Sequence, residues 1–234
     1  MNGTPFQSLA TLGTPHLADG CLRAGVGVRC APAGVRPVAG AMRCAGPARP
    51  VRHAGSIDVF LEALETSAPG EVLVVDNAGR LDEACVGDLV ALEARDAGIA
   101  GIVIWGLHRD SREIREIGLP LFSLGALPTG PQRLDPRPPD ALARAMVGAH
   151  AITPDDAVAA DADGVLFVPR ARLDDVVAAA TAVRDTERRH LDAMRAGRSY
   201  RRQVMFGEYL SRRRRDGAYG FRQHLRKIEA AGEA

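Results

Sequence analysis

Residues 70–110 read GEVLVVDNAGRLDEACVGDLVALEARDAGIAGIVIWGLHRD, and this stretch decides the fold. Its two continuous apolar runs, residues 71–76 and 101–105, predict strands that are buried on both faces. Between them, apolar residues over 84–97 recur at helical spacing, and a further helix and strand follow over residues 111–124. The order β-α-β-α-β predicts parallel strands joined by crossover helices, as in α/β proteins.

The sequence before this stretch predicts mixed elements. A helix is expected to begin at about Pro15, and residues 26–53, rich in Gly, Pro, Val and Arg, predict two or three short strands. Turns are predicted at residues 32–34 and 46–47, where Pro and Gly fall close together. Ser56 precedes apolar residues at helical spacing and is predicted to cap a helix.

The sequence after this stretch ends in a helical arm. A proline-rich loop is predicted over residues 128–140 and a strand over residues 164–168. A long helix is expected to begin at Pro169 and end at about Met194, and two further helices are expected after it. We therefore expect a body over residues 1–198 and a basic helical arm over residues 199–234.

The composition is that of a globular protein. Of 234 residues, 46% are hydrophobic and 25% are charged, which excludes disordered and collagen-like chains. No run approaches the ~18 apolar residues of a transmembrane helix, so no membrane partner is expected. The start MNGTPFQSLA lacks the pattern of a secretion signal, and a cytoplasmic location is expected. The four cysteines form no CxxC pair, which argues against a zinc knuckle.

The basic residues are unevenly distributed. The only lysine is Lys227, so catalysis through a lysine imine, which needs a desolvated lysine in a pocket, is not expected. Residues 184–234 hold 14 Lys and Arg against 7 Asp and Glu, a net charge of +7. The other 183 residues hold 16 against 22, a net charge of −6.

Two interpretations of the basic arm stay open. Its arginines, with the run Arg212–Arg215, are expected to dock on the acidic body or on a neighbouring subunit. The alternative is nucleic-acid binding, for which Tyr209, Tyr219 and Phe221 would offer stacking surfaces. The sequence favours docking, so nucleic acid is not expected as a partner.

Two loops that follow the predicted strands carry the candidate chemistry. The first contains Gly87 and Asp88 at a helix start, where free N–H groups and the helix dipole favour an anion. The second contains Arg109, a planar donor for a carboxylate, and Asp110, an oxygen ligand for Mg²⁺. Because loops at the carboxyl ends of parallel strands meet, both can face one crevice. The alternatives are that Asp88 only caps its helix, and that Arg109 and Asp110 form a surface ion pair or cap the helix at Ser111.

Residues 70–110, continued by REIGLPLFSLG at 115–125, resemble the RraA-like family. This family includes the metal-dependent 4-hydroxy-4-methyl-2-oxoglutarate and 4-carboxy-4-hydroxy-2-oxoadipate aldolases. The combination of GDL with a downstream RD carries the resemblance, which extends more weakly over residues 17–170 and includes RCAGPARPV at 43–51. The resemblance implies an α-β-β-α sandwich of the swivelling type that forms homotrimers or homohexamers, with active sites between subunits.

The resemblance also implies roles for individual residues. Backbone amides of the loop Gly87, Asp88, Leu89 and Val90 are expected to hold the pyruvyl part of the substrate, and Arg109 is expected to bind it as well. Asp110 is the expected direct metal ligand, and Asp88 is expected to hold metal-bound water that moves a substrate proton.

A further acid is expected from a neighbouring subunit. Glu187 is the candidate, acting on the metal through water, with Asp185 as its rival. The sequence departs from the family at Trp105, which either packs beneath the cleft or narrows it. It also departs at His108, either a loop or interface side chain or a second base.

The resemblance implies a lyase dependent on Mg²⁺ or Mn²⁺. The expected reaction is retro-aldol cleavage of a 4-hydroxy-2-oxo acid to pyruvate, with oxaloacetate decarboxylation as a related activity. Without a lysine in the body, a cation is needed to stabilise the enolate that both reactions form. The alternative is a non-catalytic regulator that acts through protein partners, and the presence of Asp110 favours the enzyme.

Overall fold

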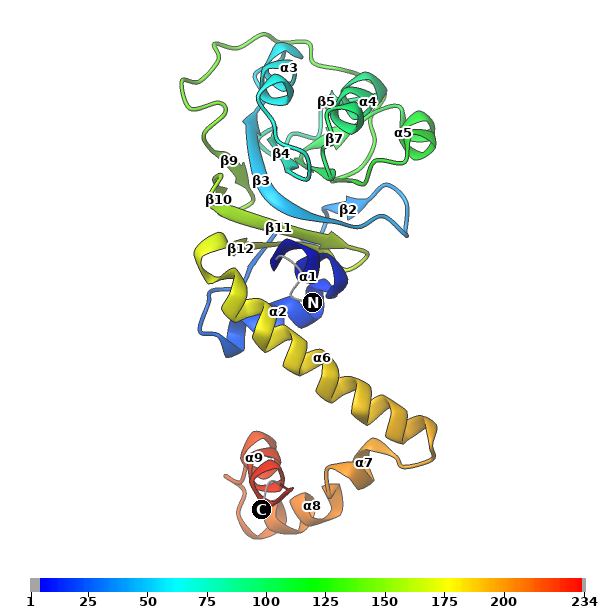
Figure 1. The fold of residues 1–234 in the computed structure, drawn as a ribbon, viewed down its shortest axis with the longest axis vertical. Coiled ribbons are helices and arrows are strands. Elements are labelled where there is room, and N and C mark those ends of the chain that lie inside the picture. The colour runs from blue at the N-terminus through cyan, green and yellow to red at the C-terminus, as the bar shows by residue number, and fades with distance from the viewer. Residues whose placement is uncertain (1–4, 233–234) are drawn as a thin grey trace. The chain divides into compact units, whose positions relative to one another are not determined.

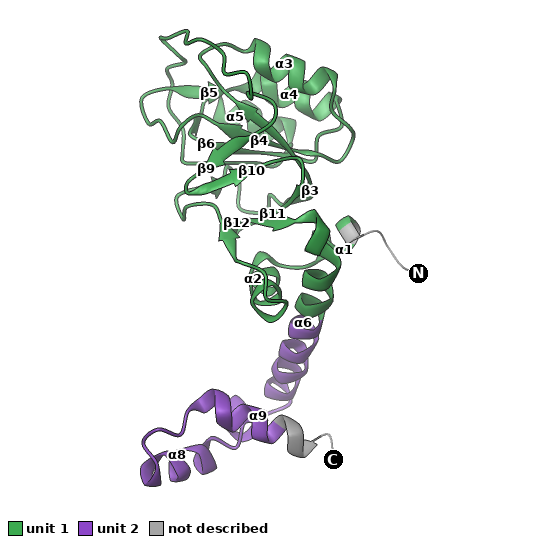
Figure 2. Ribbon diagram, turned by 90° about the vertical axis from the view of Figure 1, so that its left-hand side faces the viewer, with its two compact units in different colours: residues 1–181 green, residues 182–234 purple. Residues whose placement is uncertain are grey.

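The computed structural model describes residues 5–232, which form two compact units that divide between residues 181 and 182 (Figures 1 and 2). The helices of the first unit are α1 (Pro5–Thr11), α2 (Thr14–Arg23), α3 (Asp58–Glu65), α4 (Asp88–Asp96), α5 (Ser111–Ile117), the short 3-10 helix Arg170–Arg172 and the start of α6 (Leu173–Arg195). Its strands are β1 (Arg29–Cys30), β2 (Arg36–Pro37), β3 (Cys44–Arg52), β4 (Val72–Asp76), β5 (Ala84–Val86), β6 (Gly101–Trp105), β7 (Leu107–His108), β8 (Leu121–Ser123), β9 (Ala145–Val147), β10 (His150–Ile152), β11 (Asp156–Asp161) and β12 (Gly164–Pro169).

One curled, eight-stranded sheet organises the first unit. Its strand order is β1-β12-β11-β3-β4-β6-β8-β2. The strands β3, β4, β6 and β8 are parallel, as the β-α-β-α-β order predicts, and the remaining pairs are antiparallel. The parallel register places Asp76 beside Trp105 at the carboxyl ends of β4 and β6, where the candidate loops begin.

Three hydrophobic clusters separate four layers, so the expected α-β-β-α sandwich is confirmed (Figure 1). Alternate residues of β4 face different clusters: Leu73 and Val75 pack beneath α3 and α4, whereas Val72 and Val74 face the middle cluster. The middle cluster lies between the parallel strands and β11–β12, and a third cluster joins those two strands to α1, α2 and α6. All five residues of β4 are buried, which explains the apolar run Val72–Val75. The fifth, Asp76, is a buried carboxylate that accepts hydrogen bonds from the Ala78 and Met146 amides.

Several predicted elements differ from the structure. Strand β3 runs through residues 46–47 without the predicted turn. Gly46 serves close packing there instead, because a Cβ on it would lie 2.0 Å from the Gly70 carbonyl oxygen. The helix predicted over 84–97 is a strand, β5, followed by α4, which begins only at Asp88. The helical spacing places Leu89 and Leu92 on a buried face, but they are 65% and 37% exposed.

The second unit holds the rest of α6 and three helices, one more than expected. These are α7 (Tyr200–Gln203), α8 (Phe206–Arg215) and α9 (Phe221–Gly232). Tyr209, Tyr219, Phe221 and His224 form an aromatic cluster with ring centroids 5.0–6.2 Å apart. The expected domain boundary at residues 198–199 stays a prediction. The two compact units divide after residue 181, within helix α6.

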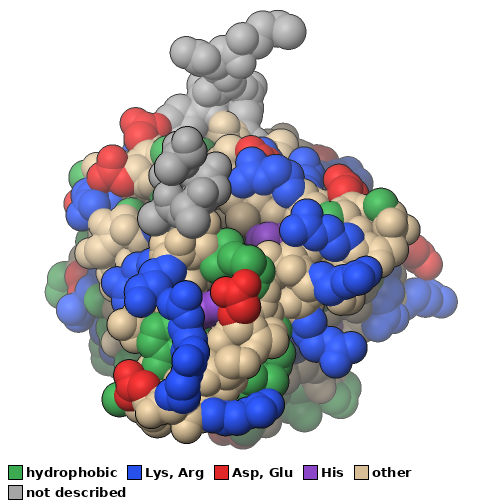
Figure 3. Space-filling view, turned by 90° about the horizontal axis from the view of Figure 1, so that it is seen from below, with side chains coloured by type: hydrophobic (Ala, Val, Ile, Leu, Met, Phe, Trp, Pro, Cys, Tyr) green, Lys and Arg blue, Asp and Glu red, His purple; other side chains and the backbone are tan. Residues whose placement is uncertain are grey.

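Three basic side chains of the second unit lie over rings of this aromatic cluster: Arg212, Arg213 and Lys227. Arg and Lys side chains predominate over acidic ones on the face in Figure 3. Arg212 and Arg213 lie over the rings of Tyr219 and Tyr209, 5.8 and 5.9 Å from the centroids. Both tyrosines are buried, so their faces are not open to the base stacking that nucleic-acid binding would use. In the part of the chain that the structure describes, no helix is long and apolar enough to cross a membrane.

Candidate functional site

The two candidate loops lie side by side in the first unit. Strand β5 leads into α4 and pairs with β7, which leads into α5. The Arg109 amide donates to the Val86 carbonyl oxygen at 2.9 Å, which places the Arg109–Asp110 pair next to Gly87. The sequence therefore predicts correctly that these loops share one crevice.

Asp110 does not cap the helix that follows it. It occupies the N-cap position of α5 in a left-handed conformation (φ 61°, ψ 42°), and its side chain makes no capping hydrogen bond. Instead, Oδ2 accepts a hydrogen bond from the Asp88 amide at 3.3 Å and lies 3.4 Å from Arg109 Nε. Asp and Asn adopt this left-handed conformation more readily than other non-glycine residues, so it causes little strain at Asp110.

Gly87 makes room for this carboxylate. Its backbone is extended (φ −128°, ψ −165°), so no unusual conformation requires glycine here. A Cβ on Gly87 would instead lie 2.4 Å from Asp110 Oδ2 and 3.2 Å from Arg109 Nε. Glycine at residue 87 is therefore explained by the position of the Asp110 side chain.

A hollow of about 130 Å³ opens beside these groups. Five of the predicted site residues line it, whereas Asp110 does not: Gly87, Asp88, Leu89, Val90 and Arg109. The rest of its lining is His53, Gly55, Ile57, Ala84, Cys85 and Pro131. Burial raises the pKa of the Cys85 thiol far above its ordinary value, so this thiol is neither a nucleophile nor a ready metal ligand.

Asp88 is the first residue of α4 and not its cap, because the N-cap position is occupied by Gly87. Asp88 Oδ1 accepts a hydrogen bond from the Leu89 amide at 2.8 Å. Two of the amides expected to hold the substrate, those of Asp88 and Leu89, thus have carboxylate partners in this structure. Both amides therefore donate to anionic groups of the chain itself.

The donor set suits a metal that keeps much of its water. Among the residues that the structure describes, no three His, Cys, Asp or Glu side chains converge to hold a metal. Mg²⁺ is commonly held by one or two carboxylates, with water and substrate oxygens in the other positions. Asp110, with a side chain 33% exposed beside the hollow, fits that mode of binding.

The expected acids from a neighbour lie elsewhere in the chain. Glu187 and Asp185 belong to the part of α6 in the second unit, whereas the other site residues lie in the first. Asp185 pairs with Arg184 at 2.8 Å. The contribution of Glu187 to a second subunit's site stays a prediction.

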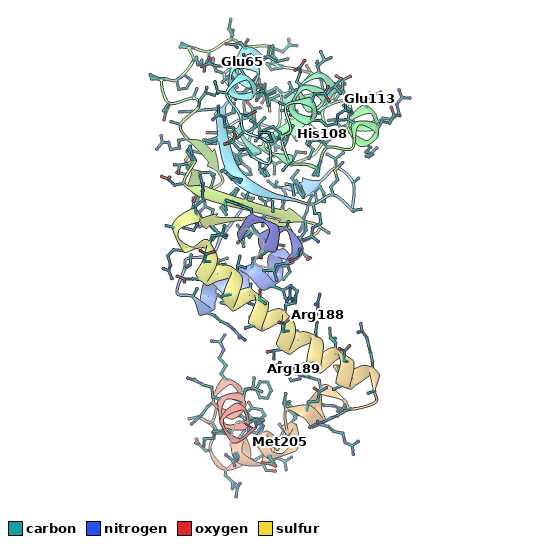
Figure 4. All side chains as sticks on the ribbon, viewed as in Figure 1. Glu65, His108, Glu113, Arg188, Arg189 and Met205 are labelled. Atoms are coloured by element: carbon teal, nitrogen blue, oxygen red, sulfur yellow. The ribbon has the colours of Figure 1, made fainter. Side chains whose placement is uncertain are left out.

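The two departures from the family pattern are packed side chains. His108 is buried beside α5 (Figure 4), with Nδ1 2.7 Å from Ser123 Oγ and Nε2 2.8 Å from Ser111 Oγ. Burial lowers its pKa, so the ring is neutral and links β7, β8 and α5. Trp105 packs on Gly79, where a Cβ would lie 2.7 Å from its ring.

A buried polar network next to the hollow is absent from the sequence-based predictions. Its members are His53, Asn77, Glu83 and Arg133. Arg133 reaches Glu83 at 2.8 Å and Asn77 at 3.2 Å, and His53 Nδ1 lies 2.9 Å from Asn77 Oδ1. The only hint of this network in the sequence is Glu83, an acidic residue directly before an apolar strand. The sequence does not show which residues pair with Glu83.

Comparisons with known proteins find relatives that carry an aldolase name. A Burkholderia mallei protein named "Putative 4-hydroxy-4-methyl-2-oxoglutarate aldolase" is 37% identical over 139 residues, which cover 59% of this chain and 83% of that protein. A protein of the same name from Halalkalibacterium halodurans is 32% identical over 138 residues, 56% of this chain. That match spans only 62% of the relative's length.

A solved structure shows the same fold. Streptomyces coelicolor RraAS2, described as an unusual member of the RNase ES inhibitor RraA protein family, is similar with a TM-score of 0.70 and 28% identity. The similarity covers 80% of this chain and 96% of that one. The sequence profile of the RraA-like family, described as Aldolase/RraA, matches residues 14–167, which include both site loops. With the profile covering well over half of its sequence, the chain belongs to the RraA-like family.

Proposed function

We propose that this protein is a lyase dependent on Mg²⁺ or Mn²⁺ that cleaves a 4-hydroxy-2-oxo acid to pyruvate. Oxaloacetate decarboxylation by the same site is part of the proposal, because both reactions form the enolate of pyruvate. The observation that carries the proposal is the Asp110 carboxylate, turned away from α5 and held beside Arg109 over Gly87. The aldolase names of the relatives support it.

The start of α4 binds the pyruvyl carboxylate in this proposal. Backbone N–H groups at a helix N-terminus and the positive end of its dipole attract anions. Asp88, whose Oδ1 accepts from the Leu89 amide, would release that amide to the substrate and would hold water beside a bound metal. Arg109, 47% exposed at the hollow, donates to the substrate and stabilises the negative charge of the enolate.

The metal is assigned to Asp110, with Asp88 and an acid from a neighbour acting through water. A bound divalent cation supplies the Lewis acid that stabilises charge on the 2-oxo oxygen. Imine chemistry does not compete with this assignment, because the single lysine, Lys227, lies over the Tyr219 ring in the second unit.

We further propose a homotrimer or homohexamer whose neighbouring subunit completes the site with Glu187. Large apolar side chains surround the hollow on the surface of this chain. Ile57, Leu61 and Leu89 are 45%, 46% and 65% exposed. Burial of these side chains by a neighbour would stabilise the assembly and shield the hollow from water.

The test measures pyruvate release from oxaloacetate and from a panel of 4-hydroxy-2-oxo acids, with Mg²⁺ or Mn²⁺ and with EDTA. We expect turnover to stop in EDTA and to fall at least 100-fold in Asp110→Asn and Arg109→Ala. Arg112→Ala is the matched control, because its side chain is 79% exposed on α5 and pairs only on the surface. Metal-independent turnover, or full activity in Asp110→Asn, would contradict the proposal and favour a non-catalytic regulator.

A further inference from the structure

The tautomer of His53 follows from its hydrogen bonds. His53 Nδ1 lies 2.9 Å from Asn77 Oδ1, and Arg133 Nη2 donates to the same oxygen at 3.2 Å. Because arginine only donates, the Asn77 atom facing it is the acceptor oxygen, and Nδ1 of His53 must carry a hydrogen to bond to it. In the neutral ring, Nε2 is then the nitrogen with a free lone pair.

The ring of His53 is held rigidly at the hollow. It stacks on Phe60 with centroids 5.4 Å apart and planes 8° apart. His53 lines the same hollow as Gly87, Asp88 and Arg109. Among the residues described, Nε2 makes no hydrogen bond to a protein group. It is also not among the fully buried polar atoms that lack a hydrogen-bond partner. The His53 side chain is 2% exposed and lines two hollows, this one and another that Arg52 and Arg80 also line, so its free lone pair is reached only from within one of them.

The charges around His53 suit a ring that accepts a proton for a short time. Burial lowers its pKa, so the ring is neutral before reaction. Glu83 Oε1 lies 3.9 Å from Nδ1 and would stabilise an imidazolium, and Asp58 acts in the same direction. Arg133 opposes this effect, but it is itself paired with Glu83 and Asp135.

We propose that His53 Nε2 is the general base that removes the hydroxyl proton of the 4-hydroxy-2-oxo acid. This inference rests on the proposed function. The O–H electron pair becomes the new C=O bond, and the C3–C4 bond breaks with its electrons forming the pyruvate enolate. Nε2 then releases its proton to solvent and C3 takes one from solvent, which gives pyruvate and a second carbonyl product.

Two substrates separate this role from a structural one. Oxaloacetate loses CO₂ to form the same enolate, and it has no 4-hydroxyl proton to remove. His53→Asn keeps an N–H near the Nδ1 position for Asn77 but removes Nε2. We expect this variant to lower kcat for retro-aldol cleavage by 100-fold or more, and to change kcat for oxaloacetate decarboxylation by less than about threefold.

Two further readouts complete the experiment. In the wild type, kcat/KM for retro-aldol cleavage should fall at low pH because His53 becomes protonated. This acid limb should be absent in His53→Asn. His150→Asn, on the β9–β10 hairpin away from the lining of the hollow, is the control and should leave both reactions unchanged. The alternative base is a water held near Asp88, and Asp88→Asn tests it. This variant should still show the acid limb of kcat/KM.

Each adverse result is distinct. Equal losses in both reactions would show that His53 acts only on the structure of the site. Unchanged retro-aldol cleavage in His53→Asn would overturn the inference and leave the proposed lyase intact. This result is expected if His53 serves only the second hollow, which it lines with Arg52 and Arg80. A wild-type protein that decarboxylates oxaloacetate but cleaves no 4-hydroxy-2-oxo acid would overturn both this inference and the retro-aldol part of the proposed function. Inactivity on both substrates would instead refute the proposed function.

Discussion

Gly87→Ala tests whether the position of one carboxylate controls activity. The added methyl group would lie 2.4 Å from Asp110 Oδ2, whereas an ordinary contact is 3.4–4 Å. The carboxylate must therefore move by about 1 Å (3.4 minus 2.4). The backbone at residue 87 is extended and accepts alanine without strain. The substitution thus perturbs the site far more than the fold.

A misplacement of about 1 Å at a catalytic group can reduce the rate about 100-fold, equivalent to about 2.7 kcal/mol of activation free energy. The stability cost is smaller, about 1 kcal/mol or less, because alanine is a slightly poorer N-cap than glycine. We therefore expect pyruvate release to fall about 100-fold, with weaker Mn²⁺ binding by calorimetry and a melting temperature lowered by only a few degrees.

The matched control is Gly40→Ala, because a Cβ there meets nothing within 4 Å. This control should retain both activity and Mn²⁺ affinity. If Gly87→Ala kept full activity while a structure of the variant showed the Asp110 side chain displaced, the assigned role of that carboxylate would be wrong. Equal losses of activity in the control would mean that the assay reports on folding rather than on the site.

Two further predictions concern buried polar groups. Burial lowers the pKa of His108, so the unfolded state binds the proton more readily and the free energy of unfolding should decrease as pH falls below about 6.5. In denaturant titrations from pH 7 to 5, the free energy of unfolding of His108→Gln should decrease less than that of the wild type. The same pH dependence in both proteins would contradict this prediction. Arg133→Met leaves Glu83, 3% exposed, without its main partner and should cost about 3 kcal/mol, most of it recovered by adding Glu83→Gln. A loss below about 1 kcal/mol would mean that water replaces Arg133.

The parallel core of the fold could be predicted from local pattern. The apolar runs at 71–76 and 101–105 correspond to β4 and β6, and the predicted helix over 111–117 is α5. These predictions succeed because strands buried on both faces need apolar side chains at every residue. Strand β11 (Asp156–Asp161) has no such signal, since its alanines give no strand pattern and its place depends on β3 and β12.

Parts of the site followed from its residue types. Gly87, Asp88, Leu89, Val90 and Arg109 do line one hollow, because loops at the carboxyl ends of neighbouring parallel strands must meet. The exposure of Leu89 could not be predicted, because helical spacing identifies an apolar face but does not show which face the sheet covers.

The amino-acid sequence by itself determined the layered α/β body, the two site loops and the chemical groups at their ends. Only the tertiary structure decided the direction of the Asp110 side chain, which depends on the space above Gly87. It also brought His53, Asn77, Glu83 and Arg133 together from three separate loops, those after β3, β4 and β8. Hydrogen bonds between residues so far apart in the chain leave no periodic pattern, because each partner is selected by three-dimensional packing rather than by its neighbours in sequence.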